Sequence, residues 1–389
     1  MATNNNLEDV GLVIVDYAEI VQDPLLAQTL LGPKLAQAFG SDGMGLIAIR
    51  NVPGFVASKR AVLPMAHTLA HLPEDYLESN VVNRESGYQS GWSRGKEMLG
   101  KVPDTNKGSF YFNPLTDQPG TPEDRAKYPA SYPQNVWPSE TVLPGFQDAA
   151  KQLGTLMHNV VVQLARHVDS FALEKCGVDS SNNPLYADPN LLYNAMRTTI
   201  KAKGRLLYYY PLPETSEDVP TEDSWIGWHN DSGFLTALAG DMYVDDTSGE
   251  EISREIDKEA GLYVTSRSGG DAQKVEIPFD CMGVQIGECV QIVTGGHVVA
   301  TPHCVRGSRK PSMARISLPC FVDAGASMPL KLPKGCSREQ VLNASIPNPH
   351  VPPLNKRWNE DGMEFGVFLH NTFSTYYDWQ EEAPEENEE

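Results

Sequence analysis

The chain has 389 residues, of which 40% are hydrophobic, so it can bury a large core, and its length alone permits two or three domains. Its formal net charge of −20 argues against nucleic acid or an anionic membrane surface as a partner, because both are bound through clustered Lys and Arg side chains. The N-terminus is polar, and no apolar run approaches the roughly 20 residues that span a membrane, so the protein is expected to be cytoplasmic. Its six cysteines show no regular spacing, which indicates reduced thiols. We expect the protein to be a monomer.

The N-terminal part of the chain is predicted to be rich in helix. Apolar residues at helical spacing predict a helix over 25–39, which Pro33 would kink or split, and a long helix over 145–173. Between them, residues 45–50 are typical of a buried strand. Residues 82–140 contain many Gly, Pro and Asn residues with little periodicity, and this composition predicts long surface loops.

From about residue 204 the pattern changes to short strands separated by turns, which predicts a jelly roll or a sandwich. The predicted strands are 205–210, 234–239, 261–265, 275–277, 284–286, 290–293, 297–300 and 316–322. The acidic residues 242–259 are predicted to form an insertion loop. A helix is expected over 364–376, and the acidic residues 381–389 are expected to be a disordered tail.

The motif His229-Asn-Asp231 is the first candidate site. At the start of a strand these two side chains project to one face, because side chains alternate with a period of two. Two His and one carboxylate occupy one face of an octahedron around Fe(II) and leave the opposite face for cosubstrate and O₂. An isolated HxD pair is more often accidental than metal-binding. A third ligand must come from a distant strand, and the residues alone leave His297 and His303 as candidates.

Arg315-Ile-Ser317 is a second candidate site, because Arg and Ser at this spacing share one face of a strand. A guanidinium group binds a carboxylate through two parallel hydrogen bonds, and a hydroxyl adds a third. This pair suits the carboxylate of a dicarboxylic 2-oxo acid at the end remote from a metal.

The order of these motifs resembles that of the Fe(II)/2-oxoglutarate oxygenases related to isopenicillin N synthase. The segments that carry the resemblance are Gly45 to Gly54, Tyr208-Tyr-Tyr-Pro211, His229-Asn-Asp231, Gly261-Leu-Tyr-Val264, Gly287-Glu288, Thr294-Gly-Gly296, His303 and Arg315-Ile-Ser317. The resemblance covers roughly residues 10–325 and is stronger in the C-terminal half. The sequence departs from the family pattern at Tyr208, Glu288 and Cys304, and in the long acidic segment 242–259.

The resemblance implies a mainly β fold with α-helices, in which a double-stranded β-helix (jelly-roll) core has an N-terminal helix-rich region packed against it. The implied regions are a helix-rich part over 1–200, the oxygenase core over 201–325, and a helical extension with an acidic tail over 326–389. It also selects His303 over His297, so that the implied iron ligands are His229, Asp231 and His303.

The same resemblance implies that Arg315 and Ser317 bind the far carboxylate of 2-oxoglutarate and that Tyr210 helps to hold this cosubstrate. The implied reaction uses Fe(II), 2-oxoglutarate and O₂, with ascorbate as reductant in an assay. It oxidises a C–H bond of a small metabolite, by default through hydroxylation, and releases succinate and CO₂.

Two alternative functions remain open at the level of the sequence. The same type of enzyme can carry out oxidative cyclisation or desaturation of an amino-acid-derived natural product, as in kainoid synthases and isopenicillin N synthase. A non-catalytic binding protein on the same fold is an alternative of another class.

The loop over 87–101 is the candidate substrate-binding segment. It combines the bases Arg94 and Lys96 with the aromatic residues Tyr88 and Trp92. On a strongly acidic protein such a local basic cluster could attract a carboxylate-bearing metabolite, and the aromatic rings could pack its carbon skeleton. An ordinary solvated loop is an equally simple interpretation.

Overall fold

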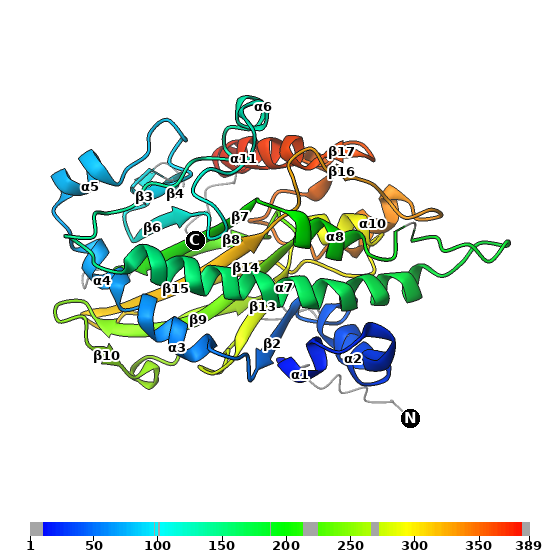
Figure 1. The fold of residues 1–389 in the computed structure, drawn as a ribbon, viewed down its shortest axis with the longest axis horizontal. Coiled ribbons are helices and arrows are strands. Elements are labelled where there is room, and N and C mark those ends of the chain that lie inside the picture. Colours follow the sequence, from blue (N-terminus) through cyan, green and yellow to red (C-terminus); the bar gives the residue numbers. More distant parts are fainter. Residues whose placement is uncertain are drawn as a thin grey trace, which may run out of the picture.

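A large mixed sheet runs through the centre of the computed structural model, which describes residues 11–96, 98–99, 102–186, 188–212, 225–265 and 272–382 (Figure 1). Its strands follow the order β1-β2-β13-β9-β15-β7-β6-β3, and β10 pairs with β9. They are β1 (Val13–Asp16), β2 (Leu46–Arg50), β3 (Gly91–Arg94), β6 (Lys107–Phe112), β7 (Ala202–Tyr209), β9 (Leu235–Asp245), β10 (Glu251–Ile252), β13 (Met282–Ile286) and β15 (Met313–Val322).

A smaller sheet contains four of the described strands, in the order β12-β11-β14-β8. Its strands are β8 (Ile226–His229), β11 (Gly261–Val264), β12 (Gln273–Lys274) and β14 (His303–Arg306). Two short pairs complete the described strands, namely β4 (Met98–Leu99) with β5 (Val102–Pro103) and β16 (Pro329–Leu330) with β17 (Met363–Glu364).

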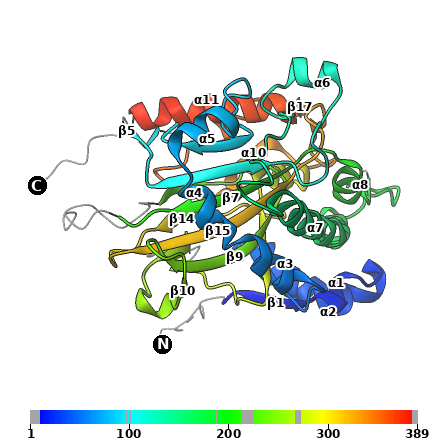
Figure 2. The same cartoon turned by 60° about the vertical axis from the view of Figure 1, so that its left-hand side comes forward.

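Helices pack around the large sheet. They are α1 (Tyr17–Ile20), α2 (Pro24–Phe39), α3 (Phe55–Val62), α4 (Met65–Ala70), α5 (Glu74–Asn80), α6 (Pro122–Lys127), α7 (Phe146–Cys176), α8 (Leu191–Thr198), α9 (Glu288–Val293), α10 (Arg338–Ala344) and α11 (Phe365–Glu382), with the 3-10 turns η1 (Arg254–Ile256) and η2 (Leu354–Lys356). The long α7 crosses one face of the sheet and contacts β9 and β15. Figure 2 shows α2 and α3 gathered beside it.

The apolar stripe of α7 explains its position. Leu153, Met157, Val161, Leu164 and Val168 recur at helical spacing and are all fully buried in the main hydrophobic core. Burying such a stripe against a sheet is the main source of stability for a helix of this kind, because its polar face stays in water.

The predicted helices over 25–39, 145–173 and 364–376 are confirmed as α2, α7 and α11. Pro33 lies inside α2 and does not split it. The predicted strand over 45–50 is β2. Among the described residues, no helix combines the length and the apolar character that crossing a membrane requires.

Five of the eight strands predicted after residue 204 are confirmed, as β7, β9, β11, β13 and β15. The other three predictions are wrong. Residues 290–293 belong to the helix α9, residues 297–300 have no regular structure, and 275–277 follow the short β12 as irregular chain. A short run of buried apolar residues has the same pattern in a strand and in a fully buried helix, and every residue of α9 is buried.

Two loop predictions are wrong in part. Residues 82–140 contain β3, β6 and α6, and all six residues of β6 are buried. The predicted insertion over 242–259 begins inside β9, which continues to Asp245, and it also contains β10. Strand pairing across the sheet buries β6 and residues 242–244 of β9, which local composition could not predict. Of the predicted tail, residues 383–389 lie outside the described residues.

The regions predicted over 1–200 and 201–325 share one sheet. From the N-terminal region, β1 and β2 join through β13, and β6 pairs with β7. The N-terminal part therefore contributes strands as well as helices to the framework of the core.

Candidate metal centre and cosubstrate cavity

His229, Asp231 and His303 come together where two strands of the smaller sheet meet. His229 ends β8, His303 begins β14, and the two residues are direct partners in the antiparallel pair. Asp231 follows β8 by two residues, and its Oδ1 lies 4.0 Å from Nε2 of His229 and 3.9 Å from Nε2 of His303. All three potential ligand atoms lie within 4.8 Å of one another. The register of two strands thus unites residues that are distant in sequence.

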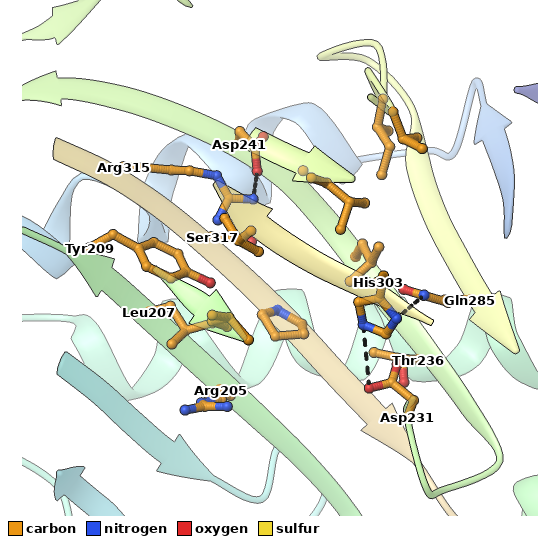
Figure 3. A pocket seen from close by; sticks show the side chains of 18 of the residues that line it. Arg205, Leu207, Tyr209, Asp231, Thr236, Asp241, Gln285, His303, Arg315 and Ser317 are labelled. Atoms are coloured by element: carbon orange, nitrogen blue, oxygen red, sulfur yellow. Dashed lines mark hydrogen bonds and ion pairs between the residues drawn. The ribbon is translucent and has the colours of Figure 1, made fainter. Parts of the chain in front are cut away.

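The second nitrogen of each imidazole is engaged, which orients both rings. Nδ1 of His229 donates to the carbonyl oxygen of Gly227 at 2.8 Å. Nδ1 of His303 lies 3.1 Å from the carbonyl oxygen of Thr301 and 2.7 Å from the Gln285 amide (Figure 3). Because a carbonyl oxygen only accepts, Nδ1 of His229 carries the proton and the Nε2 lone pair of that ring faces Asp231.

The protonation state of His229 also suits a metal ligand. Loss of solvent around the ring lowers the pKa of His229 to about 4, and the neighbouring His303 acts in the same direction, against the Asp231 carboxylate. The imidazole is therefore neutral at physiological pH, as metal coordination requires. Two imidazoles and one carboxylate form the donor set that suits Fe(II).

A buried ion pair supports the His229-Asn-Asp231 segment from behind. The Glu288 carboxylate, at the start of α9, accepts from the Asn230 side chain at 3.0 Å and from Nη2 of Arg357 at 2.6 Å. The hydroxyl of Tyr376 in α11 lies 3.3 Å from the backbone N–H of Asn230 and accepts from it. The C-terminal extension therefore packs directly against the segment that carries two of the three ligands.

A cavity between the two sheets opens beside the triad. It contains about 670 Å³ of atom-free space including its mouth. Most of its walls are apolar, with Leu207, Leu262, Val305 and Phe321 among the lining residues. Its polar groups include Arg205 of β7, Asp241 of β9, and Arg315 and Ser317 of β15.

Arg315 and Ser317 lie on the cavity face of β15 (Figure 3). The Arg315 side chain is only 4% exposed, and one amino group, Nη2, forms an ion pair with Asp241. Within the described part of the chain, its Nε and Nη1 have no hydrogen-bond partner. Burial alone would lower the pKa of Arg315, but Asp241 outweighs this and raises it, so the guanidinium stays charged. Two buried donors without an acceptor fit a carboxylate ligand.

Tyr209, and not Tyr210, lines the cavity beside Arg315. Tyr209 is the direct cross-strand partner of Arg315, whose guanidinium carbon lies 4.8 Å from the ring centre. Tyr210 donates its hydroxyl to the carbonyl oxygen of Ala70 at 3.0 Å and does not line the cavity. The structure thus places Tyr209, the neighbour of the predicted Tyr210, at the cavity. In a strand, a shift by one residue moves a side chain to the opposite face.

The predicted substrate-binding residues of the 87–101 loop do not line this cavity in the described structure. Trp92 is buried over Gly108 in the core, and the Arg94 guanidinium stacks on the ring of Tyr210 at 3.7 Å. Lys96 pairs with Glu78 at 3.5 Å, and its ammonium lies 5.5 Å from the ring of Tyr88. Each of the four has a structural contact outside the cavity. Lys101, the last residue of the predicted loop 87–101 and its third base, lies outside the described residues.

Arg205 is a cavity residue that the sequence analysis missed. It lies on β7 two and four residues before Leu207 and Tyr209, and all three line the cavity (Figure 3). Its Nε donates to the Ser109 hydroxyl at 3.0 Å, and its charge contributes to the lowered pKa of His229. The period of two in the predicted strand 205–210 could have identified it, because alternate residues share a face.

Comparisons with known proteins identify the fold. No protein-family model and no curated sequence matches the chain. A 2OG-Fe(II) oxygenase family protein from Caulobacter crescentus is 18% identical with a TM-score of 0.61, over 94% of this chain and 99% of its own. A full-length Neurospora crassa protein, solved in complex with alpha-KG, is 18% identical with a TM-score of 0.65, over 95% of this chain and 98% of its own.

A third solved structure, JOX2 in complex with 2OG, Fe and JA, is 16% identical with a TM-score of 0.57, over 93% of this chain and 85% of its own. At these levels of identity the likeness establishes the arrangement of strands and helices. The chemistry must be argued from the residues of the cavity.

Proposed function

We propose that this chain, which has the fold of the 2OG-Fe(II) oxygenases, is an Fe(II)- and 2-oxoglutarate-dependent oxygenase of a small molecule. One observation carries the proposal. A His-Asp-His triad and a buried arginine with two unpartnered N–H groups line the same cavity. We also propose that the two sheets around this cavity correspond to the double-stranded β-helix expected from the sequence.

The fit of the donor set assigns roles to the residues. His229, Asp231 and His303 would hold Fe(II), while Arg315 and Ser317 would bind the far carboxylate of 2-oxoglutarate, with Tyr209 beside them. When bound together, iron, cosubstrate and O₂ supply oxidation of a C–H bond with release of succinate and CO₂. The chain contributes orientation through these contacts and excludes bulk water through the apolar walls of the cavity.

Arg205 points to the class of substrate. A second arginine in the same cavity, besides the one assigned to 2-oxoglutarate, suits a carboxylate or another anionic group of the substrate. The overall charge of −20 would repel such a molecule at long range, so a cation inside the cavity is needed to bind it. We therefore propose a small carboxylate-bearing metabolite, with hydroxylation as the reaction.

Succinate release tests the proposal. The purified chain is incubated with Fe(II), ascorbate, 2-oxoglutarate and a panel of small carboxylic and amino acids. We expect one class of compound to stimulate succinate formation and to gain one oxygen atom by mass spectrometry. A chain that binds Fe(II) and 2-oxoglutarate without turnover on any compound would instead support a binding protein.

Arg205→Gln separates the substrate assignment from the reaction class. We expect this variant to bind 2-oxoglutarate normally and to show a raised KM for the carboxylate substrate. A wild-type KM would remove Arg205 from the substrate site and leave the oxygenase proposal intact.

A further inference from the structure

His297, which the sequence left as an alternative to His303, lies in a second cluster of potential metal ligands together with Cys176 and Cys336. Cys176 is the last residue of α7, His297 lies in the turn after α9, and Cys336 precedes Ser337, the N-cap of α10. The two sulfur atoms and an imidazole nitrogen of this cluster all lie within 4.8 Å of one another. Three segments that are remote in sequence thus converge on one point.

The backbone next to this cluster contains two glycines that let the turn lie close to Cys336. Gly295 and Gly296 have φ values of 67° and 82°, in the left-handed region that favours glycine. A Cβ atom at Gly295 would lie 2.5 Å from the sulfur of Cys336, so a larger residue there would displace this thiol. The Gln340 side chain donates to the carbonyl oxygen of Gly295 at 2.9 Å and fastens α10 to the same turn.

The chemistry of the three side chains selects a particular kind of ion. Thiolate and imidazole ligands suit Zn²⁺, whereas Mg²⁺ and Ca²⁺ prefer oxygen ligands. Burial raises the pKa of Cys176 to about 12, and burial also raises the pKa of Cys336. Without a cation both are therefore protonated thiols, which argues against a reactive nucleophile or redox sensor at this position.

We propose that Cys176, His297 and Cys336 form a second metal site that binds one Zn²⁺ ion, separate from the iron triad. All three residues are half-buried, so solvent can occupy a fourth position of the tetrahedron. The ion would join the end of α7, the α9–β14 turn and the start of α10. Its role is structural, because it fastens to the core the same C-terminal extension whose Arg357 supports the His229-Asn-Asp231 segment.

Cobalt substitution tests the site in the full-length chain, because thiolate ligands give Co(II) an intense charge-transfer absorption that oxygen and nitrogen ligands do not. We expect one equivalent of Co(II) to produce this absorption in the wild type, and added Zn²⁺ to remove it. Cys176→Ser/Cys336→Ser should lose the absorption and His297→Ala should weaken or lose it. His229→Ala should retain it, because the iron triad contains no sulfur.

Cys281→Ser is the matched control, since it removes a buried thiol that is not part of the cluster and should leave the absorption unchanged. Circular dichroism checks that each variant is folded, and His297→Gln provides a milder substitution if His297→Ala is not. The proposal is overturned if the wild type shows no thiolate absorption, or if the double variant keeps it. Finding fewer than six free thiols in the unfolded, unreduced wild type would also overturn it in favour of a disulfide.

Discussion

Arg315 lines the cavity, and its Nε and Nη1 have no acceptor in the described structure, so 2-oxoglutarate binding should depend on it more than on any apolar wall. We predict that Arg315→Gln raises the concentration of 2-oxoglutarate needed for half-maximal turnover by roughly 30-fold or more, because losing such a pair costs about 2–5 kcal/mol. Arg315→Lys should also be impaired, since an ammonium cannot form two parallel bonds. A titration like that of the wild type in Arg315→Gln would contradict the assignment, and iron content serves as the control.

Asp241 forms an ion pair with the guanidinium of Arg315 and carries a negative charge, as 2-oxoglutarate does. We predict that Asp241→Asn lowers the dissociation constant of 2-oxoglutarate by several-fold, because it removes a like charge from a cavity with few solvent contacts. Calorimetry with Mn²⁺ in place of Fe(II) measures this without turnover. Asp280→Asn, an exposed position, is the matched control. Weaker binding by Asp241→Asn would show that Asp241 orients Arg315 and that this effect outweighs repulsion.

His297 and His303 were both candidates for the third iron ligand, and the structure places only His303 beside His229 and Asp231. This leads to a further prediction. His229→Ala, Asp231→Ala and His303→Ala should each lose bound iron and turnover, because each removes one of three facial ligands. His297→Ala, where circular dichroism shows that it is folded, should keep its bound iron and most of its turnover, because His297 is not a ligand of the triad. Iron content and succinate formation are measured for all four variants. An active His303→Ala would refute the triad.

At the scale of elements, the Glu288–Arg357 pair connects α9 to the C-terminal extension. Arg357 is fully buried and Glu288 is 2% exposed, so removing one partner leaves a buried charge without compensation. We predict that Arg357→Met lowers the free energy of unfolding by about 3–5 kcal/mol. It should also weaken iron binding, because Glu288 orients Asn230 between two of the ligands.

The double variant Glu288→Gln/Arg357→Met distinguishes a charge effect from a packing effect. If the buried charge is the cause, the double variant should be more stable in urea than Arg357→Met alone, because neither charge remains. Equal or lower stability of the double variant would show that the loss comes from packing.

At the scale of the whole molecule, the site lies between two sheets and its ligands would contact both. His229 and His303 belong to the smaller sheet, while Arg315 and Ser317 belong to the larger one. Ligand at about 100 times its dissociation constant should stabilise the fold by about 2.7 kcal/mol. We predict that Mn²⁺ and 2-oxoglutarate together raise the melting temperature of the wild type and have much less effect on His303→Ala. An equal shift in both would indicate binding elsewhere.

The sequence by itself determined the features that depend on local pattern. The helical stripe of α7 and the short strand-like segments separated by turns that became β7, β9 and β15 are local patterns, so they could be recognised without the fold. The spacing of Arg315 and Ser317 placed this pair on one face of a strand, and the His229-Asn-Asp231 motif was recognised as a metal-binding pattern, although Asp231 follows the end of β8. The likeness of the motif order to a known family then joined these pairs into one expected site.

Only the tertiary structure decided which faces meet. Strand register placed Tyr209 and not Tyr210 beside Arg315, and it brought Arg205 into the cavity. The burial of α9 turned an expected strand into a helix, and the path of the C-terminal extension brought Arg357 to Glu288. These outcomes depend on contacts between segments that are remote in sequence. A pattern of period two or 3.6 shows that a face exists, but its partner is set by packing and hydrogen bonding across the whole chain.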